Sequence, residues 1–172
     1  MELRELKDKY YKAHGAYLAY RNINKTNETE SQFIPDALQA IKKAFPESNI
    51  TVIGDNILNY LGVDFIVSVG EKQILLDLKV CQHNDGFNVC IDGYKHKGDD
   101  WFPANDVKIN DWFLFINGDY FIFIPSNLVD IPPMEECFFY KRDIYKTTKK
   151  AIVDLSCKRK VAIPRGGING KI

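Results

Sequence analysis

The fold is decided by the stretch Gly62-Val63-Asp64-Phe65-Ile66-Val67-Ser68-Val69-Gly70-Glu71-Lys72-Gln73-Ile74-Leu75-Leu76-Asp77-Leu78-Lys79-Val80. Apolar residues alternate along residues 63–69, which is typical of a strand with one buried face. Residues 73–80 are more uniformly apolar, as in a strand that is buried on both faces. Gly70-Glu71 lies between the two segments, and a glycine at the first central position favours a two-residue type II′ turn. The sequence therefore predicts an antiparallel hairpin.

A two-residue turn at positions 70 and 71 also fixes the register of this hairpin. Val69 would pair with Lys72, so Asp64 would face Asp77. Asp64, Asp77 and Lys79 then share one face. Opposed carboxylates repel each other across a strand pair. A divalent cation between them would turn that repulsion into ligation, because Mg²⁺ prefers one or two carboxylates together with water and phosphate oxygens. The other face is apolar and carries Val63, Phe65, Val67, Ile74, Leu76 and Leu78.

An acid, followed about a dozen residues later by Asp-x-Lys at the end of a buried strand, resembles the PD-(D/E)XK nuclease superfamily. The residues that carry the resemblance are Asp64 and Asp77-Leu78-Lys79, and Val63 stands where the motif has its proline. The resemblance covers residues 28–95. It implies a restriction-endonuclease-like fold and an endonuclease that hydrolyses phosphodiester bonds in DNA.

The same resemblance implies roles for individual residues. Asp64 and Asp77 would bind Mg²⁺, for which Mn²⁺ would substitute, and Lys79 would position or activate the attacking water. Gln82 is similar to a glutamine that follows the motif in some branches of the superfamily. A third acid often comes from the helix before the hairpin, and Glu30 fits that place.

A helix over residues 30–45 is predicted from an apolar stripe of Ile34, Leu38, Ile41 and Phe45. Glu30 precedes Ile34 by one helical turn, so it lies on the core-facing side. A carboxylate there is unusual unless it has a partner. The alternative is that Glu30 stabilises the helix N-terminus through the helix dipole. Pro35 leaves the start of this helix open.

The remaining elements follow from local patterns in the chain. We expect a helix over residues 2–20 with a linker to residue 27, a strand over 49–53 and a turn or short helix over 55–61. A strand over 87–91 and a polar loop over 92–103 come next. The dipeptide Asn117-Gly118 predicts a hairpin of residues 111–116 and 119–124. Further strands are expected at 137–140 and 160–163, and a flexible tail at 165–172. The predicted fold is a single α/β domain, with a mixed sheet of five or six strands between the helices at 2–20 and 30–45.

Length and composition indicate one globular domain. The chain has 172 residues, of which 45% are hydrophobic, with no run that approaches a membrane span and no signal-peptide pattern. Its four cysteines have no C-x₂-C spacing and indicate free thiols, hence a cytoplasmic protein. A zinc site formed by Cys81, His83 and Cys90 is a disfavoured alternative.

Charge is unevenly distributed, although the chain is neutral overall. Residues 141–172 hold ten basic and two acidic residues, so this segment carries +8 and residues 1–140 carry −8. Such asymmetry suggests a basic surface for a polyanion beside an acidic site. The alternatives are a solvated tail and, for the 92–103 loop, a surface loop whose Trp101 and Phe102 fold into the core. The residues expected to bind nucleic acid are Lys95, Lys97, Lys149, Lys150, Lys158 and Arg159.

The expected partner is DNA, without a membrane, and a homodimer or higher homo-oligomer is consistent with the resemblance. Two other functions remain open at this point. One is a non-catalytic nucleic-acid-binding domain of the same fold. The other is a protein-interaction or inhibitor module of phage or mobile-element origin, in which the acids are incidental.

Overall fold

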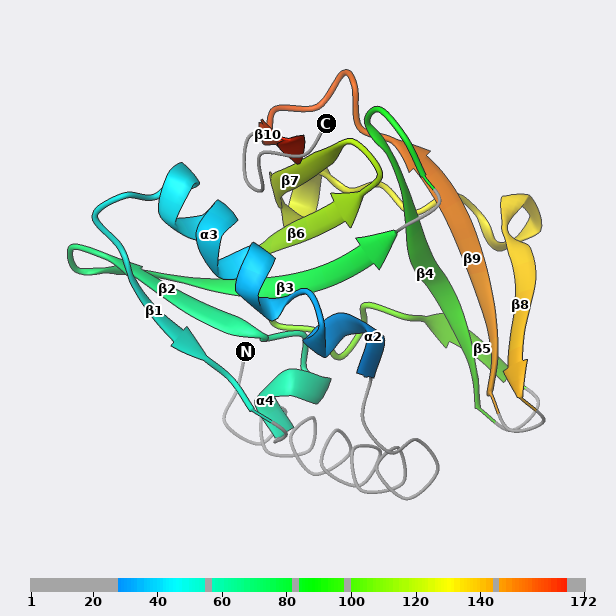
Figure 1. Cartoon of the computed structure of the whole chain (residues 1–172). Coiled ribbons are helices and arrows are strands. Elements are labelled where there is room, and N and C mark those ends of the chain that lie inside the picture. The colour runs from blue at the N-terminus through cyan, green and yellow to red at the C-terminus, as the bar shows by residue number, and fades with distance from the viewer. Residues whose placement is uncertain (1–27, 55–56, 82–83, 98–99, 144–145, 167–172) are drawn as a thin grey trace.

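The computed structural model describes residues 28–54, 57–81, 84–97, 100–143 and 146–166 (Figure 1). The helix expected at residues 2–20 and its linker lie outside the described residues, as do Gln82 and His83. The side chains of Lys97 and of residues 141–147 are also outside the description.

A six-stranded mixed sheet forms the centre of the described chain, as predicted. Its only parallel pair among the described strands is β3 with β6, and every other neighbouring pair is antiparallel. In sheet order the strands are β1 (Asn49–Val52), β2 (Phe65–Val69), β3 (Lys72–Cys81), β6 (Trp112–Asn117), β7 (Tyr120–Pro125) and β10 (Val161–Pro164).

A second, four-stranded antiparallel sheet stands beside the first (Figure 1). The prediction of a polar loop at residues 92–103 is wrong, because β4 continues to Lys97 and pairs with β5. A bulge at Gly93, in the pairing of β4 with β9, interrupts the alternation of side chains along β4. In sheet order the strands are β5 (Asp100–Pro103), β4 (Asn88–Lys97), β9 (Lys146–Asp154) and β8 (Phe138–Asp143).

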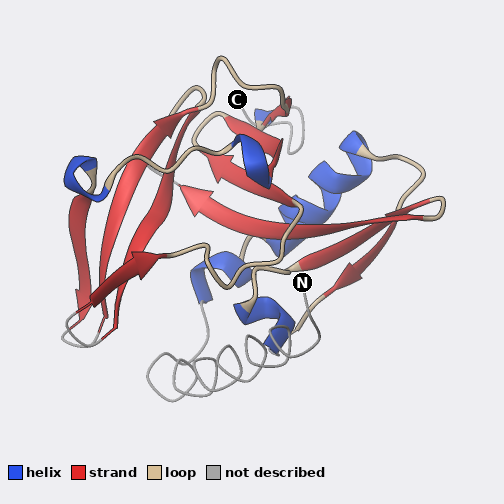
Figure 2. Ribbon diagram, turned by 180° about the vertical axis from the view of Figure 1, so that it is seen from behind, coloured by secondary structure: helices blue, strands red, loops and turns tan. Residues whose placement is uncertain are grey.

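Two strands of this second sheet, β4 and β5, belong to the crossover between the parallel strands β3 and β6, whereas β8 and β9 lie between β7 and β10 in the chain. Such crossovers usually contain a helix, but here the chain goes through β4 and β5 before the 104–111 segment returns to β6 (Figure 2). The second sheet consequently lies next to the carboxyl end of β3, where Cys81 contacts the backbone of Cys90.

The predicted hairpin register is confirmed. Val69 pairs with Lys72 and Phe65 with Leu76, so opposed positions run as the two-residue turn requires. Gly70 has a φ of 62°, a conformation that favours glycine at the start of such a turn.

The helix expected over residues 30–45 is divided in two. Pro35 lies in the first turn of α3 (Ile34–Ala44), where its missing N–H would have no intrahelical partner. A proline has no N–H for the carbonyl four residues earlier, and its ring clashes with that carbonyl. Pro35 therefore interrupts the helix after Ser31, and a separate short helix, α2 (Glu28–Ser31), carries Glu30. A third short helix, α4 (Ile57–Tyr60), precedes the hairpin.

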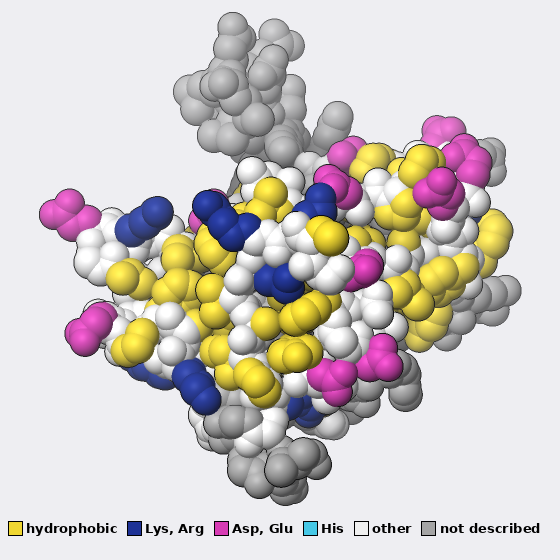
Figure 3. Space-filling view, turned by 90° about the horizontal axis from the view of Figure 1, so that it is seen from above, with side chains coloured by type: hydrophobic (Ala, Val, Ile, Leu, Met, Phe, Trp, Pro, Cys, Tyr) yellow, Lys and Arg dark blue, Asp and Glu magenta, His cyan; other side chains and the backbone are white. Residues whose placement is uncertain are grey.

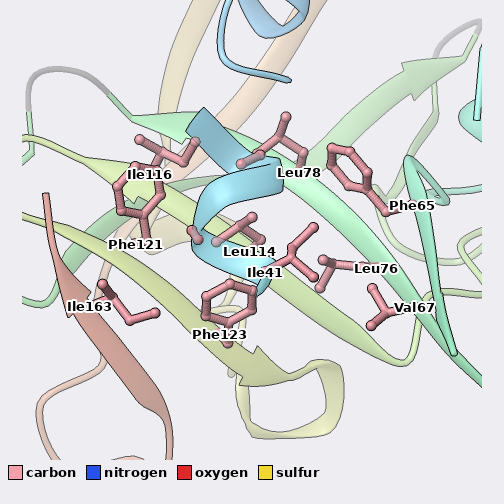
Figure 4. Close-up of a cluster of buried hydrophobic side chains, with 12 residues drawn as sticks. Ile41, Phe65, Val67, Leu76, Leu78, Leu114, Ile116, Phe121, Phe123 and Ile163 are labelled. Carbon is pink, nitrogen blue, oxygen red and sulfur yellow. The ribbon is translucent and has the colours of Figure 1, made fainter. Parts of the chain in front are cut away.

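Two apolar clusters hold these layers together. On one face of the six-stranded sheet, Ala37, Ala40 and Ile41 of α3 pack onto alternate strand residues (Figure 4). Those strand residues are Phe65, Val67, Leu76, Leu78, Leu114, Ile116, Phe121, Phe123 and Ile163. The opposite face packs against the second sheet through Phe113, Phe115, Ile122, Ile124, Val89, Ile91, Ala151 and Leu155.

The hairpin predicted around Asn117-Gly118 forms, with its turn one residue later. Ile116 pairs with Phe121, so Asn117 ends β6 and Gly118-Asp119 makes the connection. The Asn117 side chain is fully buried: its oxygen accepts the backbone N–H groups of Asp119 and Tyr120, and its amide donates to the carbonyl groups of Gly86 and of Asn88 at the start of β4. Asn117 therefore joins the two sheets instead of occupying the turn.

Candidate active site

β3 presents one carboxylate, that of Asp77, and one ammonium group, that of Lys79, on the face away from α3. Because successive side chains of a strand alternate between its faces, Leu76 and Leu78 pack under α3 while Asp77 and Lys79 point to the other side. Asp77 is only 2% exposed, and its Oδ2 atom accepts no hydrogen bond from the described groups. The Lys79 ammonium lies 3.6 Å from that oxygen.

Asp64 lies at the point where the chain enters β2. Its backbone N–H donates to the Leu76 carbonyl at 2.8 Å, and its Oδ2 accepts the Leu78 N–H at 2.6 Å. The Asn59 side-chain amide donates to the other carboxylate oxygen. These bonds hold the carboxyl group of Asp64 against β3, beside Asp77.

Burial raises the pKa of Asp64 well above its usual value, and the charges of Asp77 and Glu30 raise it further. A side-chain hydrogen bond to Asp77 acts in the same direction, while the Leu78 N–H lowers the pKa. Burial and the neighbouring acids therefore keep the carboxyl group of Asp64 protonated to a higher pH than an ordinary aspartate. The predicted register thus brings the two acids together on one face.

Glu30 reaches this cluster from α2, which contacts β3. Burial raises the pKa of Glu30, Lys79 lowers it, and Asp77 raises it again. The sequence argument placed Glu30 on the same helix as Ile34, which is wrong, but the short helix α2 still brings it within electrostatic reach of Asp77 and Lys79.

The pKa values of two lysines in the cluster are shifted in opposite directions. Burial alone would lower the pKa of Lys79, but Asp77, Glu30, Asp92 and Asp64 outweigh it and raise the pKa above its usual value. Lys79 therefore stays an ammonium ion. Burial and the charge of Lys79 lower the pKa of Lys108 to about 8.

Lys108 is the residue that the sequence argument missed. Its Nζ donates to the Tyr60 carbonyl at 3.1 Å. Gly62, with a φ of 84°, leaves room for the Lys108 stem: a Cβ at Gly62 would lie 2.8 Å from Cδ of Lys108 and 3.0 Å from Oδ1 of Asn110. Gly62 was visible in the sequence, but no spacing pattern connects it with Lys108.

A small pocket adjoins the cluster between the two sheets. It has space for a water-sized molecule, about 20 Å³, which is sufficient for an ion or a water molecule but not for a nucleobase. Its lining residues are Lys79, Ile91, Asp92, Lys95, Ala104, Asn105, Lys108, Phe113 and Val129.

The residues expected to bind nucleic acid are divided among several places. Lys95 lines the pocket, and Lys150 pairs with the pocket residue Asp92 at 3.4 Å. Lys149 instead lies over the rings of Trp101 and Phe139, at 5.2 and 4.8 Å from their centroids. Lys158 pairs with Asp130, Arg159 is exposed, and the Lys97 side chain is outside the description.

The basic C-terminal segment is folded into the protein as far as residue 166. Lys160 lies 4.3 Å from the Phe87 ring centroid, and Arg165 donates to the Asn117 carbonyl at 2.9 Å. The flexible tail therefore does not begin at Arg165, and residues 167–172 lie outside the described part. On the face shown in Figure 3, basic groups are separated by hydrophobic and uncharged atoms and do not form one continuous surface.

The disfavoured zinc site gains no support from the described residues. The Cys81 thiol exchanges hydrogen bonds with the backbone of Cys90, and all four cysteines are free. Burial raises the pKa of Cys81 to about 11, whereas zinc requires a thiolate. His83 lies outside the description.

The fit of the site to Mg²⁺ depends on Asp64 and Asp77. Among the described residues, no group of three or more His, Cys, Asp or Glu side chains is arranged to hold a metal ion. Glu30 therefore acts on the pair through its charge and does not complete a three-ligand group. Two carboxylates with water and phosphate oxygens are a set that Mg²⁺ accepts, and the buried Oδ2 of Asp77 has no hydrogen-bond partner. The donor set fits the ion.

No protein-family model, curated protein or solved structure matches this chain. The resemblance to the nuclease superfamily thus depends on the hairpin residues alone. Within the part of the chain that the structure describes, none of the helices has the length and apolar character needed to cross a membrane.

Proposed function

We propose that the protein is a metal-dependent nuclease that hydrolyses phosphodiester bonds in DNA, with Asp64 and Asp77 holding Mg²⁺. The observation that carries the proposal is the buried carboxylate of Asp77. One of its oxygens accepts no hydrogen bond from the described residues and lies beside a second carboxyl group and an ammonium ion. Mn²⁺ would substitute for Mg²⁺, because both accept oxygen ligands.

Energetics support a functional role for these acids. Burying a charged group without full compensation costs several kcal/mol, and the fold offers Asp77 little in return. Titratable groups whose pKa is strongly shifted by burial and by specific neighbours concentrate at functional sites. Asp64, Lys79 and Lys108 all have such shifts within one cluster.

The residues would divide the chemistry among them. When bound, Mg²⁺ supplies positive charge that polarises a phosphate and makes a bound water more acidic. Lys79 would remain protonated and stabilise negative charge on the phosphate, and its raised pKa argues against the earlier expectation that it takes a proton from water. Lys108, with a pKa of about 8, can hold or release a proton near neutral pH beside the same pocket.

A non-catalytic nucleic-acid-binding domain is the second candidate. The absence of a three-ligand acidic group among the described residues favours it. It predicts DNA binding without cleavage, whereas a protein-interaction or inhibitor module predicts no affinity for nucleic acid.

One assay separates these functions. The protein is incubated with supercoiled, linear and branched DNA and with RNA, in Mg²⁺, Mn²⁺ or EDTA. We expect cleavage of DNA with either metal and none with EDTA. Asp77→Asn and Lys79→Met should each reduce the cleavage rate by roughly a hundredfold or more.

The matched control is Asp85→Asn, which neutralises an exposed acid away from the cluster and should leave cleavage unchanged. Binding without cleavage would replace the nuclease with the non-catalytic domain. The absence of both binding and cleavage would favour the interaction module.

A further inference from the structure

Three consecutive aromatic residues on the edge strand β8 are unusually exposed. Phe138 is 45%, Phe139 67% and Tyr140 43% exposed. Large apolar side chains in such a group often mark a binding surface, and among the described strands β8 pairs with β9 alone.

Strand alternation divides these rings between two sides of the sheet. Phe138 pairs with Lys150 and Phe139 with Lys149, so each ring shares a side with its paired lysine. Tyr140 lies on the side of Phe138, and the Lys150 ammonium is 4.3 Å from the Tyr140 ring centroid.

The Lys150 side leads to the candidate active site. Lys150 pairs with Asp92, which lines the pocket and whose charge acts on Lys79. Lys149, on the opposite side, lies between Trp101 and Phe139. The strip formed by Phe138, Tyr140 and Lys150 therefore continues from the pocket rim, whereas Phe139 and Lys149 do not belong to it.

We propose that this strip binds an unpaired DNA strand, with bases stacked on Phe138 and Tyr140 and a phosphate held by Lys150. The inference rests on the proposed function: it specifies that the DNA cleaved at that site has a single-stranded segment. The pocket itself is too small for a base, so the bases of a strand whose phosphate reached Lys79 would have to lie outside it.

The chemistry of the strip matches this ligand. Aromatic faces accept any base, and interleaved cations track the phosphate backbone. Lys95 and Lys108 line the pocket beyond Asp92, so basic groups continue in the direction of the cluster. The partly exposed ion pair of Lys150 with Asp92 contributes little stability, so exchange of Asp92 for a phosphate has a small cost.

The test measures fluorescence anisotropy of labelled oligo-dT of about 12 nucleotides, and of a blunt duplex of equal length, in EDTA. We expect oligo-dT to bind more tightly than the duplex. Phe138→Ala and Tyr140→Leu should each weaken its binding by about fivefold or more, since a stacked base contributes about 1–3 kcal/mol. Tyr140→Phe should bind like the unmodified protein, because it keeps the ring.

Phe139→Ala is the matched control, since it removes the most exposed ring of the same strand from the opposite side, and it should change binding less than twofold. Lys150→Ala should lower the slope of log K against log salt by about 0.7 per lost phosphate contact. Lys149→Ala should leave the slope unchanged. Thermal melts confirm that each variant is folded.

Absence of oligo-dT binding, or equal losses from Phe139→Ala and Tyr140→Leu, would overturn the inference. These results are independent of cleavage because the metal is absent. Cleavage of duplex DNA by a protein that does not bind oligo-dT would reject the strip alone. Oligo-dT binding through the strip, without cleavage in Mg²⁺ or Mn²⁺, would support the strip and reject the nuclease.

Discussion

The two faces of β3 are equally buried but differ in chemistry. Leu76 and Leu78 are 1% and 2% exposed and pack under α3, while Asp77, one position away from each, is 2% exposed on the other face. Lys79 and the carboxyl groups of Asp64 and Glu30 join Asp77 there. Apolar residues of similar volume often replace buried ion pairs without loss of stability. The comparison teaches that the apolar face stabilises the fold, and we propose that the charged face serves the metal site.

The largest expected effect is on the free energy of unfolding, which should depend more on the apolar face of β3 than on the charged face. Leu78→Ala should lower the free energy of unfolding by about 2–5 kcal/mol, because it opens a cavity beneath α3. Asp77→Asn should cost less than Leu78→Ala, because the loss of the Lys79 ion pair is offset by the removal of the like-charge repulsion that Asp77 exerts on Asp64 and Glu30. Urea unfolding in EDTA measures both. Equal losses would make Asp77 a structural anchor.

A second effect concerns the pH dependence of the charged face. The pKa of Asp64 is raised in the folded protein, so its contribution to stability is complete below the unfolded value of about 3.9 and is lost as pH rises through the folded pKa. Asp64→Asn keeps an oxygen for the Leu78 N–H and cannot ionise. The melting temperature of this variant relative to the unmodified protein, in EDTA, should therefore increase from pH 4 to pH 8.

A difference in melting temperature that is constant across this pH range would contradict the raised pKa of Asp64. A large loss at every pH would mean that the bonds from Leu78 and Asn59 need both oxygens of the Asp64 carboxylate.

A smaller effect is expected at Lys108. Its pKa of about 8 lies below the unfolded value of about 10.4, so the unfolded chain binds more protons between these values and stability rises with pH there. Lys108→Met should be more stable than the unmodified protein at pH 7, with an advantage that decreases toward pH 10. Lys72→Met, at an exposed position of the β2–β3 hairpin, should show no such trend. A Lys108→Met advantage that does not change with pH would contradict the lowered pKa.

Sequence reasoning was most successful where local geometry leaves few choices. A two-residue turn permits one register, and a period of two then assigns each side chain of the hairpin to a face. The pairing of Phe65 with Leu76 and the shared face of Asp64 and Asp77 follow from these two facts. The mixed six-stranded sheet was also predicted.

The second sheet was predicted only in part: strands were expected at 87–91 and 137–140, but β5, β9 and the rest of β4 lack a clean pattern. The bulge at Gly93 interrupts the alternation of β4, so residues 92–103 resembled a loop. In β9, lysines and threonines conceal a strand whose partners come from distant parts of the chain. Its apolar residues, such as Ala151, are recognisable only once the sheet they cover is known.

Two site residues show why the rest of the site could not be read from the sequence. The position of Glu30 was predicted from the geometry of one continuous helix, but Pro35 separates α2 from α3. The contact of α2 with β3 positions Glu30 instead. Lys108 joins the cluster through a close approach to Gly62, far away in the sequence. No local pattern encodes such tertiary contacts.

The most direct test of the central claim, that the charged face of β3 is a metal site, is calorimetric titration with Mn²⁺ and Mg²⁺. We predict saturable binding of a divalent ion, with release of a proton, because the raised pKa of Asp64 leaves it a proton that the ion displaces. Repeating the titration in buffers of different ionisation enthalpy measures that release. Binding should persist in Asp85→Asn and disappear in Asp77→Asn. Absence of saturable binding in the unmodified protein, or equal binding by Asp77→Asn, would contradict the claim.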